Sequence, residues 1–122
     1  MHRILIMESY SPTRHALAMT LERAGWEVEL AETDHEALEA LEQAGYDVIL
    51  LDVDVSTGDG WRVLSALREA NNSIPVVVLI GSEGISGHQA RMLGACVVLS
   101  KPVGRDMLLS GVMEALGNPF NN

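Results

Sequence analysis

The chain has 122 residues, of which 48% are hydrophobic and 20% charged, values typical of one compact globular domain. Its formal net charge of −9 disfavours direct binding to nucleic acid or anionic membranes, because like charges repel. The single cysteine, Cys96, excludes an internal disulfide. Since no apolar run approaches the roughly 20 residues of a membrane span, we expect a cytoplasmic domain.

The N-terminal segment predicts a strand, a helix and a second strand. Residues 4–7 form a continuous apolar run, as strands covered on both faces do. A helix follows, with Ser11 as its cap, Pro12 in its first turn and Gly25 just after its end. Residues 26–30 alternate between apolar and charged side chains, which is typical of a strand nearer the edge of a sheet.

The middle of the chain continues this alternation. Thr33 and Glu36 have the spacing of a capping box, which predicts a helix that ends at Gly45. Residues 48–51 form another apolar run and predict a buried strand. Apolar side chains at helical spacing within residues 61–67 predict the third helix.

The last third of the chain supplies two further strands and two further helices. Residues 76–80 and 97–99 are apolar runs that predict strands. Between them, the glycine-containing stretch 81–94 predicts the weakest helix of the chain. The apolar spacing within residues 107–116 predicts the final helix, which ends at a Gly-Asn-Pro sequence.

Five strands that alternate with five helices predict an α/β protein with a doubly wound parallel sheet. Right-handed crossovers would place helices on both faces of that sheet. We expect one domain over residues 1–118, followed by a tail or the start of a linker at residues 119–122. In sheets of this kind the functional site lies at the carboxyl ends of the strands.

Charged residues follow several predicted strands at this end of the sheet. Glu8 follows the first strand, Asp52 ends the third, Asp54 lies two residues further on, and Lys101 follows the fifth. Crowded carboxylates repel one another unless a cation lies among them, and Mg²⁺ prefers oxygen ligands. A carboxylate beside such an ion can attack phosphorus, and a lysine can offset the charge of the transferred group.

Each of these residues also has a simpler interpretation. Lys101 is the only lysine among eight basic residues, which is consistent with a selected ammonium or with chance. Asp52 and Glu8 are alternatively acids of solvated loops. For Asp54 the simpler interpretation is a side chain that faces solvent.

Six blocks in the right order and spacing resemble the receiver domain of two-component response regulators. The resemblance covers residues 3–116, and the blocks are residues 4–8, Tyr46 to Asp52, Asp59-Gly60, Ile74 to Val76, Gly94-Ala95 and Lys101-Pro102. It implies a five-stranded sheet in the order 2-1-3-4-5, the flavodoxin-like (βα)5 arrangement.

The resemblance also implies roles for individual residues. Asp52 takes the position that accepts phosphate from a histidine kinase or phosphotransfer protein, and Lys101 takes the position that contacts the phosphoryl group. Glu8, Asp52 and Asp54 take the positions that bind Mg²⁺, and the position of Asp54 binds through its backbone carbonyl. A further hypothesis is that the Asp54 carboxylate partly compensates for Ser9, which stands where the family has an acid. The Lys101-Pro102 peptide is expected to be cis. A downstream protein or an attached output domain would receive the signal, and no enzyme activity or other cofactor is implied.

Four departures from the family pattern bear on this function. Ser9 replaces the second acid after the first strand, so we expect weakened magnesium binding. Ile80 stands where a threonine or serine holds the phosphoryl group, and Val98 stands where an aromatic residue rotates on activation. Val55-Ser56 replaces a Met-Pro pair. The conventional threonine–aromatic relay is therefore not expected to operate, and the chain resembles an atypical receiver with a degenerate site.

Two alternative functions compete with that of a phosphate-accepting receiver. The first is a pseudo-receiver, an interaction module that works without phosphorylation, which the changes at Ser9, Ile80 and Val98 favour. The second is a flavodoxin-like cofactor binder, suggested by hydroxyl side chains after the first strand. The scarcity of glycines in that loop and the lack of an aromatic pair to hold a ring make it the weaker alternative.

Overall fold

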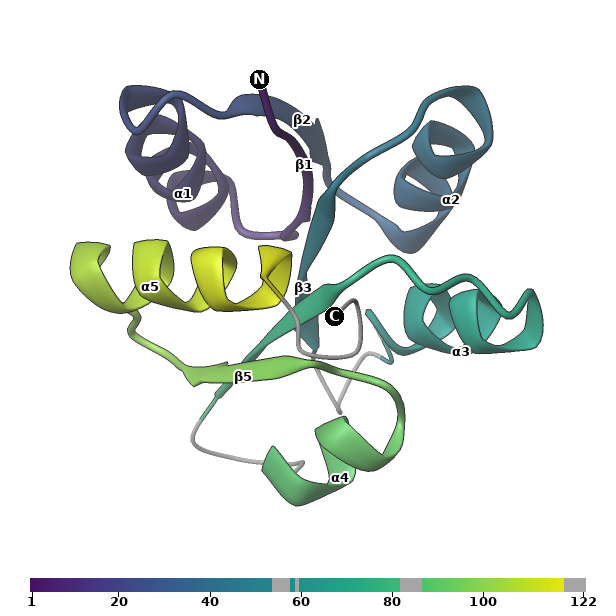
Figure 1. Ribbon diagram of the computed structural model, residues 1–122. Helices are drawn as coiled ribbons and strands as arrows, with labels where there is room; N and C mark the ends of the chain where they lie inside the picture. The colour runs from purple at the N-terminus through teal and green to yellow at the C-terminus, as the bar shows by residue number, and fades with distance from the viewer. Residues whose placement is uncertain (54–57, 59, 82–86, 118–122) are drawn as a thin grey trace.

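Figure 1 shows a computed structural model of the chain, which describes residues 1–53, 58, 60–81 and 87–117. A five-stranded parallel sheet has the order β2-β1-β3-β4-β5, as the sequence predicts. Its strands are β1 (Arg3–Met7), β2 (Glu27–Ala31), β3 (Val48–Val53), β4 (Val76–Ile80) and β5 (Val97–Ser100). The helices of the described residues are α1 (Ser11–Arg23), α2 (Asp34–Gln43), α3 (Trp61–Glu69), α4 (Gly87–Met92) and α5 (Arg105–Leu116).

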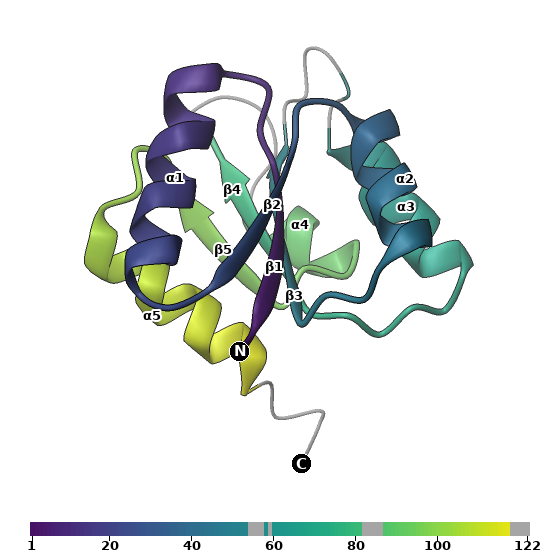
Figure 2. The ribbon, with the colours of Figure 1, turned by 90° about the horizontal axis from the view of Figure 1, so that it is seen from above.

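The sheet lies between two layers of helices, which Figure 2 shows from above. Helices α1 and α5 cover one face, and α2, α3 and α4 cover the other. Each face has its own hydrophobic cluster, and successive residues of β1 and β3 point alternately into the two. This is why the inner strands consist of continuous apolar runs: both of their faces are covered.

The edge strand β2 differs from the inner strands in the way its alternating sequence predicts. It pairs only with β1, from Arg3 opposite Glu27 to Met7 opposite Ala31. Glu27 and Glu29 are exposed, whereas Ala31 is buried beneath α2. Trp26, expected to begin this strand, instead precedes it and packs its indole ring into the core between α1 and the sheet.

Of the two helix caps predicted from the sequence, one is confirmed and the other is wrong. The Thr33 hydroxyl accepts a hydrogen bond from the Glu36 N–H at 3.1 Å, as a capping box requires. The Glu36 carboxylate, however, accepts from the N–H of Glu32 at 2.8 Å, one residue before the cap. At α1 the expectation was wrong: Tyr10 is the N-cap, the helix already begins at Ser11, and no side chain caps it.

The segment predicted to contain the weakest helix, residues 81–94, contains α4 of six residues. Residues 82–86 of this segment lie outside the described residues. The last helix, α5, lies close to the sheet at Gly111, which faces Leu99 of β5. A Cβ placed on Gly111 would lie 2.9 Å from a terminal methyl carbon of Leu99. The glycine thus allows α5 to pack tightly on β5.

Candidate functional site

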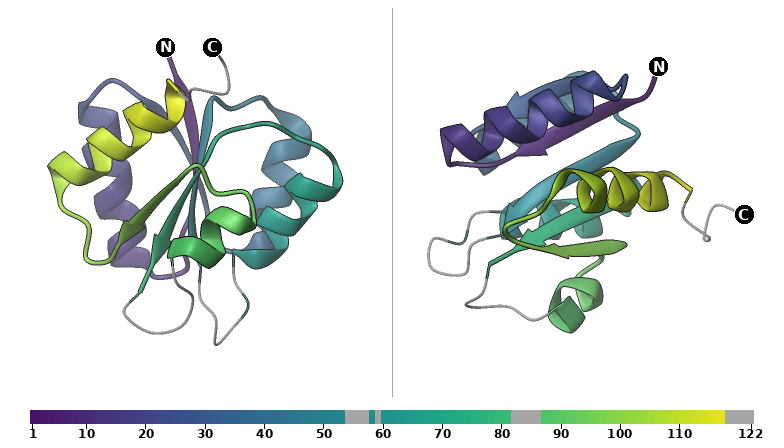
Figure 3. Two further views of the ribbon diagram at one scale, coloured as in Figure 1. Left: turned by 60° about the horizontal axis from the view of Figure 1, so that its bottom comes forward. Right: turned by 90° about the vertical axis from the view of Figure 1, so that its left-hand side faces the viewer.

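The acidic site lies at the carboxyl ends of the strands, where the sheet topology predicts it. Glu8 follows β1 directly, Asp52 is the fifth residue of β3, and Lys101 follows β5. Because β1 and β3 are neighbours, Glu8 and Asp52 leave the sheet side by side. Because all five strands are parallel, their carboxyl ends lie at this one end of the molecule (Figure 3).

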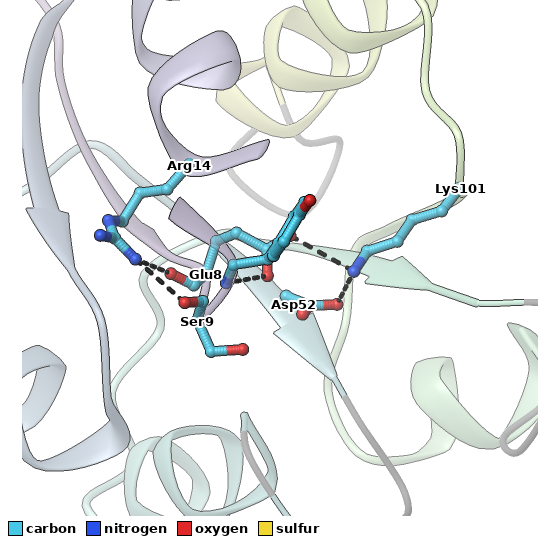
Figure 4. Close-up of polar contacts among 6 residues, drawn as sticks. Glu8, Ser9, Arg14, Asp52 and Lys101 are labelled. Atoms are coloured by element: carbon cyan, nitrogen blue, oxygen red, sulfur yellow. Dashed lines mark hydrogen bonds and ion pairs between the residues drawn. The ribbon is translucent and has the colours of Figure 1, made fainter. Parts of the chain in front are cut away.

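Lys101 joins the two carboxylates. Its Nζ lies 2.5 Å from Oδ1 of Asp52 and 3.3 Å from Oε1 of Glu8. The close-up in Figure 4 shows the ammonium reaching both acids from the loop after β5. Glu8 is only 1% exposed and Asp52 7% exposed, so both carboxylates are largely removed from water. Three groups that are far apart in the sequence therefore form one charge cluster, in which the acids are buried and Lys101 is half-buried. We call it the acid–lysine cluster.

The electrostatics of this cluster follow from burial and proximity. Burial raises the pKa of Glu8 to about 7, with further contributions from a hydrogen bond and the negative charge of Asp52, while Lys101 opposes the shift. Burial alone would lower the pKa of Lys101. Its hydrogen bond with Asp52 and the charges of both acids outweigh this effect and raise that pKa. Lys101 is therefore charged at neutral pH. Glu8 changes between its protonated and ionised forms near pH 7.

An arginine that the sequence patterns did not single out supports the first loop of the site. The Arg14 guanidinium donates to the carbonyl oxygen of Glu8 at 2.9 Å and to that of Ser9 at 3.2 Å. Figure 4 shows Arg14 on the opposite side of Glu8 from Lys101. On the inner side, the Tyr10 N–H donates to Glu8 Oε2 at 3.4 Å. Arg14 is one turn into α1, and no sequence motif marks it as part of the site.

The described residues supply only part of the predicted magnesium site. Glu8 and Asp52 supply hard carboxylate oxygens at one place, although Glu8 Oε1 already faces the Lys101 ammonium at 3.3 Å. Asp54, the third predicted ligand, lies outside the described residues. Within the described part of the chain no group of three acids, histidines or cysteines is arranged to hold a metal. The Lys101 ammonium is the cation that the described residues themselves place between the two carboxylates.

Three of the positions that depart from the receiver pattern fall within the described residues. Ile80 ends β4 opposite Ser100 of β5 and is buried among apolar side chains. Val98 is half-buried and packs on the same side, toward Gly87 at the start of α4. Ser9 is exposed, whereas Val55-Ser56 lies outside the described residues. The Lys101-Pro102 peptide is cis, as expected.

A groove separates α1 from α5 beside the cluster. It has a volume of about 610 Å³, and Lys101 lies on its wall with Arg105 and Thr13. Its floor is apolar and includes Leu17, Leu79 and Leu108, whereas Glu8 and Asp52 do not line it. The stem of Lys101 thus separates an apolar groove from the acids.

The described part of the chain contains no helix that is both long and apolar enough to cross a membrane.

Sheet topology and site together define a doubly wound α/β domain with an acid–lysine cluster at the carboxyl ends of its strands. The family model of the response regulator receiver domain matches residues 4–113. The chain therefore belongs to the response regulator receiver domain family, whose members act in two-component signalling.

Relatives with curated descriptions agree with this assignment. Response regulator MprA of Mycolicibacterium vanbaalenii is 32% identical over 115 residues, which are 93% of this chain and 50% of the relative. Transcriptional regulatory protein PcoR of Escherichia coli is 33% identical over 117 residues, which are 95% of this chain and 52% of the relative. The chain thus spans about half the length of these relatives.

Solved structures show the same fold. The chemotaxis response regulator CheY4 of Vibrio cholerae has a TM-score of 0.83 and 28% identity, with 94% of this chain and 98% of that chain covered. A CheY-like receiver domain protein from Methanospirillum hungatei has a TM-score of 0.87 at 24% identity, with 99% and 98% of the two chains covered. The second of these likenesses concerns the fold alone.

Proposed function

We propose that this receiver domain accepts a phosphoryl group on Asp52. The observation that carries the proposal is the contact of 2.5 Å between Lys101 Nζ and Asp52 Oδ1, beside the buried Glu8. A carboxylate oxygen of Asp52 forms the new O–P bond while the bond from phosphorus to the donor's imidazole nitrogen breaks. The nitrogen leaves with the electron pair and takes up a proton. Lys101 offsets the negative charge of the phosphoryl oxygens.

For magnesium, the proposed ligands are Glu8, Asp52 and Asp54. The ion, when bound, would neutralise charge on the phosphoryl oxygens. Ser9 offers only a neutral hydroxyl where receivers usually have an acid, so binding should be weak. Ser9→Asp adds a carboxylate and should tighten magnesium binding by about tenfold in a calorimetric titration. Ser65→Asp adds the same charge on the exposed face of α3 and should change nothing. Equal effects of the two variants would contradict this site.

The partners proposed follow from the family and from the length of the chain. A histidine kinase or a phosphotransfer protein would donate the phosphoryl group, in the cytoplasm. A downstream protein or an output domain would read the state of residues 1–118, the proposed receiver unit, beyond which residues 119–122 form a tail or begin a linker. Repulsion by the net charge of −9 argues against a direct role of this domain in binding nucleic acid or membranes.

The decisive experiment is phosphoryl transfer from phosphoramidate in the presence of magnesium, followed by intact-protein mass spectrometry. The wild-type chain should gain one phosphoryl group, and Asp52→Asn should gain none because its amide is no nucleophile. Asp106→Asn changes an exposed acid of α5 and should behave as the wild type. Uptake that persists in Asp52→Asn would refute Asp52 as the acceptor.

A second function, signalling without phosphorylation, is favoured by a specific observation. Ile80 and Val98 are apolar side chains packed into one cluster, where the usual relay needs a hydroxyl and an aromatic ring. Lys101 also supplies a cation to both acids without any ligand. For this alternative, a partner captured by the wild-type chain should bind Asp52→Asn with equal affinity. Loss of that binding in Asp52→Asn would exclude it.

A further inference from the structure

Asp34 is a buried acid that the receiver pattern does not use. It is the first residue of α2, follows the N-cap Thr33, and is only 5% exposed. Its Oδ1 accepts a hydrogen bond from the backbone N–H of Gly60 at 2.7 Å, across 26 positions of sequence. Acids in a first helical turn usually interact with their own helix end in solvent. Asp34 is buried and accepts a hydrogen bond from the start of another helix, α3.

The partner of this hydrogen bond, Gly60, packs against the backbone of β3, the strand that contains Asp52. Gly60 is the N-cap of α3 and has a φ of 85°. A Cβ placed on Gly60 would lie 2.5 Å from the carbonyl oxygen of Asp52 and 3.0 Å from a methyl carbon of Val53. Only glycine tolerates both the backbone angle and this close approach. The start of α3 therefore packs closely against the backbone of Asp52.

From these contacts we propose that Asp34 is a positioning residue for Asp52: by holding the N–H of Gly60 it fixes the start of α3 against the backbone of the acceptor. A carboxylate that accepts from a buried N–H forms a short, charge-assisted bond, stronger than one between neutral groups. Asp34 thereby connects α2 to the acid–lysine cluster without touching it. Its effect on phosphoryl uptake rests on the proposed function, whereas its effect on the backbone does not.

Amide exchange measured by NMR tests the structural half of this proposal. In Asp34→Ala the Gly60 amide should exchange at least about tenfold faster, because a charge-assisted hydrogen bond is lost. The carbonyl carbon resonance of Asp52 should shift as well. Asp34→Asn keeps an acceptor oxygen and should retain slow exchange. If Asp34→Ala does not fold, Asp34→Ser replaces it, since its oxygen is one atom closer to the backbone and falls short of Gly60.

Thr33→Ala is the matched control. It removes the N-cap bond to the Glu36 N–H and so weakens the same end of α2, but it leaves the Asp34 carboxylate in place. Slow exchange at Gly60 and an unshifted Asp52 carbonyl in this variant are the expected result. Gly60 exchange that is unchanged in Asp34→Ala, or equally fast in Thr33→Ala, would overturn the proposal.

The functional half is the initial rate of phosphoryl uptake from phosphoramidate. We expect a decrease of about tenfold or more in Asp34→Ala, since small displacements of a reacting group cost large factors in rate. Asp34→Asn and Thr33→Ala should keep the wild-type rate. A wild-type rate in Asp34→Ala despite fast Gly60 exchange would overturn the positioning role. A wild-type chain that takes up no phosphoryl group would refute the proposed function, and the exchange data on Gly60 would stand.

Discussion

At the scale of single residues, Lys101 is the positive charge that contacts both acids of the site. It is the cation that holds Glu8 and Asp52 together, and both acids are buried. Two buried carboxylates without a nearby positive charge repel each other, and one of them then takes up a proton. The stability of the domain should therefore depend both on Lys101 and on pH.

Removing the ammonium tests this dependence. Lys101→Met should lower the free energy of unfolding by about 3 kcal/mol at pH near 8, because it leaves two buried acids uncompensated. Near pH 5 the loss should be smaller, since Glu8 is protonated there. Urea denaturation at the two pH values measures the effect. Arg105→Met removes an exposed cation at the start of α5 and serves as the control. An equal loss at both pH values would contradict the assigned role of Lys101.

The raised pKa of Glu8 gives a prediction of its own. The pKa is about 7 in the folded domain and 4.5 for an ordinary glutamate, so between these values the folded state binds a proton that the unfolded state has lost. Stability should thus decrease as pH rises from 4.5 to 7 in the absence of divalent cations, by up to about 3 kcal/mol from this group. Glu8→Gln should flatten the profile over this window. A wild-type profile that rises through it would contradict the pKa.

At the scale of elements, the position of α5 depends on a glycine and a leucine. Gly111 faces Leu99, which is buried in β5, and an added methyl group would lie 2.9 Å from a terminal methyl carbon of Leu99, so the leucine side chain would have to shift. Helix propensity favours alanine over glycine by about 1 kcal/mol, but the crowding opposes this gain. The two residues should therefore be energetically coupled.

A double-mutant cycle measures this coupling. Leu99→Ala alone should cost about 3 kcal/mol through the cavity it leaves. Gly111→Ala alone should be neutral or destabilising, because its methyl group meets the leucine. In the double variant that methyl group enters the space left by Leu99, so its stability should exceed the sum of the single effects by about 1 kcal/mol. Additive effects, measured by thermal unfolding, would show that α5 does not pack as described.

At the scale of the whole molecule, charge is the dominant property. The chain carries 17 acidic and 8 basic residues, and the acids of its edge strand and second helix are mostly exposed. Like charges over a small surface destabilise the compact state through self-repulsion. The repulsion is long-range and therefore sensitive to ionic strength.

Added salt should stabilise the domain for this reason. Raising NaCl from about 20 mM to about 200 mM shortens the screening length to below about 10 Å and should raise the melting temperature by a few degrees. A neutral osmolyte at equal osmolarity should give a smaller change. A melting temperature that falls with salt would mean that the attractive pairs, such as Lys101 with Asp52, outweigh the repulsion.

Much of this fold could be predicted from sequence because its signals are local. Continuous apolar runs mark β1, β3, β4 and β5, since strands covered on both faces need apolar side chains at every position. The alternation in β2 marks an edge strand. Because parallel strands end at one side of the sheet, Glu8, Asp52 and Lys101 could be expected to meet there. The sequence alone thus determined the fold class and these three members of the site.

Only the tertiary structure decided how strongly the members of the site interact. Distances, burial and the raised pKa of Glu8 depend on packing between strands that are distant in sequence, and no local pattern encodes them. The same holds for Arg14 and Asp34, whose contacts cross from one element to another. The residues around Arg14 and Asp34 in the sequence indicate only that a helix begins there. The sequence determines which side chains are present, whereas the fold determines what surrounds each of them.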